Sequence, residues 1–76
     1  MTADKPERQA PALRERERQA AAQLEHLEAE ARHHRNRLAL YNARVLTGQP
    51  FSQMRLEELR RISASADARL AHAKTQ

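Results

Sequence analysis

Apolar residues recur along the first half of the chain at alternating steps of four and three. Eight of the ten positions on this stripe are apolar, and the spacing of 3.5 residues continues for more than four heptads. Such a pattern is typical of a coiled-coil seam and predicts one long amphipathic helix. The stripe consists of Leu13, Glu17, Ala20, Leu24, Leu27, Ala31, His34, Leu38, Tyr41 and Val45.

The ends of this helix are marked by residues that start or stop helices. Pro11 suits a first helical position, where its missing N–H costs no hydrogen bond. Gly48 suits the left-handed position just after a helix, and Pro50 follows two residues later. We therefore predict a disordered tail over residues 1–10 and a first helix over residues 11–47.

A second helix is predicted after a short turn, with the turn at residues 48–51 and the helix at residues 52–74. Ser52 can cap its N-terminus, and Phe51 can pack on Leu56 as a hydrophobic staple. Its stripe again follows steps of three and four: Leu56, Leu59, Ser63, Ala66, Leu70 and Ala73.

The two stripes agree with one another when the chain folds back on itself at the turn. A short connection makes the helices antiparallel neighbours. If the fold point lies between residues 48 and 49, every stripe residue of the second helix meets one of the first. The layers are Val45 with Ser52, Tyr41 with Leu56, Leu38 with Leu59, His34 with Ser63, Ala31 with Ala66, Leu27 with Leu70, and Leu24 with Ala73. The predicted fold class is all-α, an antiparallel two-helix coiled-coil hairpin with a longer first helix.

The predicted arms are unequal, and the core is small. Residues 11–23 extend beyond the second helix by about 20 Å at 1.5 Å per residue. Leu, Ile, Val and Phe make up only 12 of 76 residues, so the hairpin alone would be marginally stable. We expect a homodimer that completes a helical bundle, with an interaction overhang formed by Leu13, Glu17, Ala20 and Leu24.

Charge is distributed unevenly. Residues 1–30 carry five basic and seven acidic side chains, whereas residues 31–76 carry nine and three. The predicted hairpin gathers a basic patch of Arg32, Arg35, Arg37, Arg60 and Arg61. This patch would bind phosphate or an acidic protein surface, and the alternative is an ordinary solvated surface. Because the chain has only one Tyr and one Phe, it offers no stacking platform for bases.

The flanks of the seam carry further charges. Like charges that face each other across a seam destabilise it slightly, so they suggest pairing with a second copy related by a two-fold axis. Chance placement is the competing explanation. The register places Glu28 near Asp67, Arg35 near Arg60 and Arg44 near Arg55, and only Glu30 with Arg69 is complementary.

One polar layer is predicted inside the seam, where His34 faces Ser63. Polar core positions of this kind fix the register of coiled coils, and a hydrogen bond between these two is the simplest interpretation. A pH switch at His34 is the alternative. A metal site at His26 and His72 is conceivable, but solvated histidines are the simpler interpretation because no metal-binding motif is present.

These features favour a non-enzymatic protein. We see no nucleophile with its base, no phosphate-binding glycine loop, no cysteine and no apolar run of membrane-spanning length, and we expect no cofactor and no small-molecule substrate. The expectation is a small cytoplasmic regulator or adaptor that dimerises and binds a protein. The arginine and alanine bias suggests a bacterial source. The alternative is a basic accessory protein that binds DNA or RNA through backbone phosphates.

Overall fold

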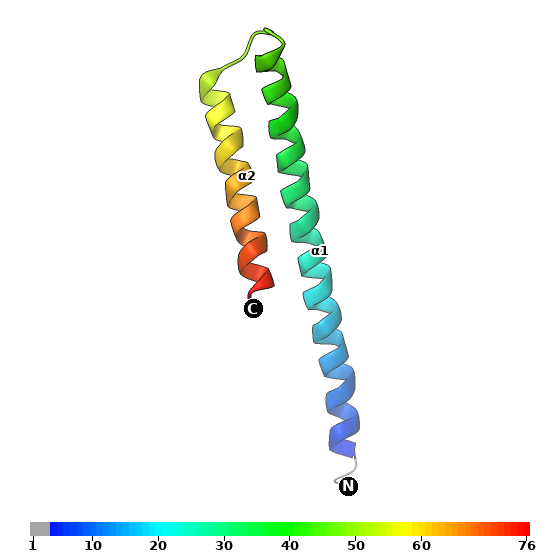
Figure 1. Ribbon diagram of the computed structural model, residues 1–76. Coiled ribbons are helices and arrows are strands. Elements are labelled where there is room, and N and C mark those ends of the chain that lie inside the picture. Colours follow the sequence, from blue (N-terminus) through cyan, green and yellow to red (C-terminus); the bar gives the residue numbers. More distant parts are fainter. Residues whose placement is uncertain (1–3) are drawn as a thin grey trace.

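The protein is an antiparallel hairpin of two helices of unequal length (Figure 1). The computed structural model describes residues 4–76, with side chains from residue 12 onward. Helix α1 spans Asp4–Leu46 and helix α2 spans Gln53–Lys74. The two pack side by side in a rod that measures 73 × 15 × 14 Å. The predicted all-α hairpin with a longer first helix is confirmed.

The first helix begins earlier than the sequence predicted. It starts at Asp4, whereas the predicted start was residue 11. Pro6 lies in the first turn of this helix, where a missing N–H breaks no helical hydrogen bond. The remainder of the predicted tail, residues 1–3, lies outside the described residues.

The core is a single seam between the helices. Ala31 is 0% exposed and Ala66 is 1% exposed, and together with Leu70 they form a buried cluster on which Leu24 and Leu27 pack. These five residues belong to adjacent predicted layers. The two alanines are the most buried members of this cluster, and the leucines pack around them.

An ion pair beside the seam gives independent support for the predicted register between the two helices. Arg69 forms an ion pair and hydrogen bond with Glu30, as the predicted pairing required. Every stripe residue of α2 is buried or half-buried, and so is every stripe residue of α1 from Leu24 onward. The heptad assignment is therefore confirmed for α2 and for α1 from Leu24 onward.

The end of α1 is closed by a Schellman motif. Gly48 has φ +76°, and its N–H donates to the carbonyl of Val45 at 3.2 Å. The N–H of Gln49 donates to the carbonyl of Arg44 at 3.0 Å. These two bonds satisfy carbonyls that the last helical turn leaves without a partner. The predicted left-handed role of Gly48 is confirmed.

The start of α2 is capped as predicted. Ser52 has extended backbone angles, φ −110° and ψ 125°, and its hydroxyl accepts a hydrogen bond from the N–H of Arg55 at 3.2 Å. The carbonyl of Ser52 accepts the first helical bond, from the N–H of Leu56 at 3.0 Å. Phe51 keeps about half of its surface exposed, and its packing on Leu56 stays a prediction.

A hydrogen-bond clip joins α1 to the turn, which the sequence did not predict. The N–H of Ser52 donates to the hydroxyl of Tyr41 at 2.7 Å, and this hydroxyl lies 3.4 Å from the carbonyl of Ser52. The guanidinium of Arg44 lies 5.7 Å from the centre of the Tyr41 ring. The hydroxyl of Tyr41 thus links α1 directly to the residue that caps α2.

Candidate functional site

The most conspicuous surface of the molecule is the part of α1 that α2 does not cover. Figure 1 shows α1 continuing well past the C-terminal end of α2. On this overhang the apolar stripe persists, but Leu13 is 54% exposed and both Glu17 and Ala20 are exposed. Leu24, at the edge of the covered region, is half-buried. The stripe therefore extends beyond its intramolecular partner.

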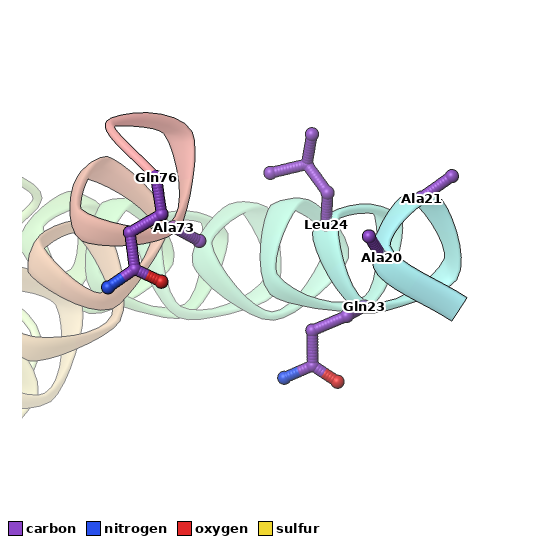
Figure 2. Close-up of a pocket in the computed structure, with 6 residues that line it drawn as sticks. All are labelled: Ala20, Ala21, Gln23, Leu24, Ala73 and Gln76. Atoms are coloured by element: carbon purple, nitrogen blue, oxygen red, sulfur yellow. The ribbon is translucent and has the colours of Figure 1, made fainter. Parts of the chain in front are cut away.

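A cavity of about 430 Å³ lies at the step where α2 ends against α1. Leu24 and Ala20 project from α1 on one side of it, and Ala73 and Gln76 lie at the end of α2 (Figure 2). Its lining consists of Ala20, Ala21, Gln23, Leu24, Ala73 and Gln76. Most of these side chains are small or apolar, so the cavity suits an apolar side chain of another helix.

The overhang also carries charged residues, one of which, Glu17, belongs to the stripe itself. Arg18 pairs with Glu15 at 3.6 Å, three residues apart on the outer face. Both side chains are largely exposed, so the pair contributes little stability. Leu13 and Ala20, the apolar members of the stripe in this segment, are exposed.

The polar layer lies where the register placed it, but its chemistry differs from the prediction. Ser63 is buried and His34 is half-buried. The Nδ1 atom of His34 is buried and has no hydrogen-bond partner among the described residues, so this atom does not form the predicted bond to Ser63. The His34 ring instead meets the His33 ring edge-on, with 5.3 Å between the ring centres. A pH switch at His34 stays a prediction.

The basic residues do not form one uniform patch. Arg32, Arg60 and Arg61 are exposed, whereas Arg37 is half-buried. Arg35 pairs with Asp67 across the seam at 3.5 Å.

The pair of Arg35 with Asp67 corrects the prediction of which charged residues meet beside the seam. Glu30 with Arg69 was predicted as the only complementary pair, but Arg35 with Asp67 is a second one. The long side chain of Arg35 reaches Asp67, which lies seven residues, or about two helical turns, from Arg60, so Cα register alone does not decide its partner. The like-charge argument for a two-fold dimer is accordingly weaker on this flank.

The remaining histidines have ordinary surface contacts. The Nε2 atom of His26 lies 3.6 Å from the Oε2 atom of Glu30, and the Nε2 atom of His72 lies 2.8 Å from the side-chain amide nitrogen of Gln76. Within the described residues, no group of three or more His, Cys, Asp or Glu side chains is arranged to hold a metal ion.

Sequence and structure comparisons do not add a function. We found no protein-family model, no curated protein and no solved structure that matches the chain. Over the described residues, neither helix is long and apolar enough to cross a membrane. The functional argument therefore rests on the surfaces described above.

Proposed function

We propose that this protein is a non-enzymatic interaction module, a small regulator or adaptor that dimerises through its overhang and binds a protein partner. The observation that carries the proposal is the exposed continuation of the α1 stripe past the end of α2. A cytoplasmic location and a bacterial source belong to the same proposal and rest on composition alone.

The dimensions of the overhang support a helical partner. Residues 4–23 of α1 span about 30 Å, and α2 spans about 33 Å, at 1.5 Å per residue. One more helix of the length of α2 would therefore cover the uncovered stripe. A second copy of the chain supplies helices of this kind, and a two-fold axis would cover both overhangs at once.

The size of the core also supports association. Among the described residues only five hydrophobic side chains are buried, and two of these are alanines. A core this small rarely contributes more than ~3–5 kcal/mol. Covering the overhang and the cavity beside it would add apolar burial that the isolated chain lacks.

Sedimentation equilibrium tests the dimer. At tens of micromolar the wild type should show about twice the chain mass of 8.7 kDa. Ala20→Glu places a charge on the stripe and should shift the protein to monomer. Ala22→Glu makes the same change two residues away, off the stripe, and serves as the matched control. A fully helical wild-type monomer, or equal effects of the two variants, would refute dimerisation through the overhang.

A second candidate function is binding of DNA or RNA through backbone phosphates. It is favoured by the charge of +6 over residues 31–76 and by the exposed Arg32, Arg60 and Arg61. A salt titration separates the two functions, because each phosphate contact contributes about 0.9 to the log–log slope. We expect weak duplex binding. Tight binding at physiological salt that is lost in Arg35→Glu with Arg60→Glu would favour the nucleic-acid function instead.

A further inference from the structure

A groove runs along the closed end of the hairpin, away from the overhang. It has a volume of about 340 Å³ and is lined by Arg37, Leu40, Tyr41, Arg44, Arg55 and Leu59. The four residues from α1 follow the spacing i, i+3, i+4 and i+7, so they lie on one face over two turns. Arg55 and Leu59 are four residues apart on α2 and form the opposite wall. The groove therefore lies between two helices and follows their direction.

Three of the six residues that line the groove, Leu40, Tyr41 and Leu59, supply apolar or aromatic surface. Leu40 is 71% exposed, and it lies off the stripe that faces α2. Of the five large exposed hydrophobic residues within the described chain, four are at this end: Leu40, Leu46, Phe51 and Met54.

The rim of the groove is positively charged. Residues 37–61 contain five arginines and two glutamates, a net charge of +3. Arg55 pairs with Glu58 at 3.2 Å. Over the described part of the chain, neither Arg37 nor Arg44 forms an ion pair with a carboxylate. An apolar floor with arginines on both walls complements apolar side chains flanked by carboxylates.

The groove is also held in shape before anything binds. Gly48 closes α1, Ser52 caps α2, and the hydroxyl of Tyr41 accepts a hydrogen bond from the N–H of Ser52. Tyr41 itself is part of the groove wall. A preformed site loses less entropy on binding than a flexible one.

We propose that this groove is the docking site for an acidic amphipathic helix of a partner protein. A third helix lying between two antiparallel helices is a common way of burying such a groove, with apolar anchors at i, i+3, i+4 and i+7. The apolar stripe of the ligand would contact Leu40, Tyr41 and Leu59, and its carboxylates would reach Arg37 and Arg44. The inference rests on the proposed function, because it names the chemistry of the protein partner.

A second copy of the chain is a poorer fit for this groove. The overhang is the segment of a second copy that has an accessible apolar stripe, and its residues 12–24 carry three arginines and two glutamates, a net charge of +1. Docking it against a groove lined by three arginines would oppose like charges. The carboxylates must therefore come from another protein.

The test uses the full chain and a designed probe. The probe is a fluorescent helical peptide of about three heptads with Leu at the core positions and Glu at the flanking positions. A matched peptide carries Lys in place of Glu. By fluorescence anisotropy at physiological salt, the Glu peptide should bind at least about ten-fold more tightly than the Lys peptide. Equal binding of the two peptides, or no binding of the Glu peptide, would overturn the proposal.

Substitutions locate the binding to the groove. Leu40→Ala with Arg44→Gln removes one apolar anchor and one charge, and it should weaken binding of the Glu peptide by about ten-fold or more. Lys74→Gln removes one positive charge at the far end of α2 and should leave the affinity nearly unchanged. Circular dichroism confirms that each variant keeps its helicity. Full binding by the double variant would overturn the proposal.

Other occupants give distinct results. If the double variant loses the dimer in sedimentation, a second copy fills the groove and the proposal fails. If a DNA duplex competes for the groove more strongly than the Glu peptide, the groove binds phosphates and the proposal also fails. The proposed function fails separately: a monomer that binds the Glu peptide refutes the dimer alone, whereas a dimer that ignores the peptide refutes the docking site alone.

Discussion

Two leucines close together in the hairpin should respond very differently to the same substitution. Leu59 of α2 is 4% exposed and lies in the seam, whereas Leu40 of α1 is 71% exposed and lies on the outer surface. Replacing each by alanine removes the same atoms. Only Leu59→Ala removes them from a packed environment, so only that variant should lose substantial stability.

The magnitudes follow from burial. A buried leucine replaced by alanine costs about 2–5 kcal/mol, through lost transfer free energy and the cavity left behind. That is comparable to the ~3–5 kcal/mol that a core of this size contributes in total. Leu59→Ala should therefore leave the chain largely unfolded at room temperature. Leu40→Ala should stay within about 0.5 kcal/mol of the wild type, because the site is exposed and alanine has the higher helix propensity.

Urea denaturation followed by circular dichroism at the helical minimum measures both free energies of unfolding. All variants are compared at one protein concentration, since a dimer links stability to concentration. If Leu40→Ala proves as destabilising as Leu59→Ala, the reasoning is refuted. In that case Leu40 would be buried in an oligomer interface, or the register between α1 and α2 would be wrong.

The closed end allows three further predictions, each measured as a shift in thermal midpoint. Gly48→Ala should cost about 1–2 kcal/mol, because alanine is strained in the left-handed backbone conformation at this position. The added Cβ would meet no atom within 4 Å, so no steric clash adds to this cost. An unchanged midpoint would contradict the Schellman turn. Ser52→Ala should cost about 1 kcal/mol through loss of the bond from the N–H of Arg55, whereas Ser52→Asp should keep most of it. Tyr41→Phe removes only the hydroxyl that bonds to Ser52 and should cost about 0.5–1.5 kcal/mol; a neutral result would mean that water replaces the clip.

Much of the fold was predictable because it depends on helical periodicity. The stripes on α1 and α2 fixed which faces meet, and Gly48 and Ser52 fixed where the chain turns. Ala31 and Ala66 could be paired from the sequence alone, because the two stripes place them in the same layer, and both belong to the buried cluster. Helical backbone geometry repeats regularly, so the position of a residue along the chain was enough to predict which face of its helix it occupies.

What could not be predicted depends on side-chain reach. Arg35 was assigned a like-charged neighbour by register, yet its long side chain reaches Asp67. The Nδ1 atom of His34 is buried without the expected partner, because ring orientation is not set by heptad position.

The groove was missed for a different reason. Its signal was present in the sequence, since Arg44 was placed near Arg55 and Leu40 was an apolar residue off the stripe. Neither observation alone indicates a binding surface, and only the packed helices bring both to one site.

The unequal lengths of the two helices have a consequence for how the chain folds. Contacts across the seam close loops that lengthen steadily from the turn, from Tyr41 with Ser52 to Glu30 with Arg69. Loop closure costs more entropy as the loop lengthens, so pairing of the helices should start at the turn and proceed outward one layer after another. Pairing stops where α2 ends, near Leu24, and the described stripe residues before it, Leu13, Glu17 and Ala20, are exposed. In the proposed dimer, burial of this exposed stripe is a bimolecular step, so its rate should rise with protein concentration while closure of the hairpin does not.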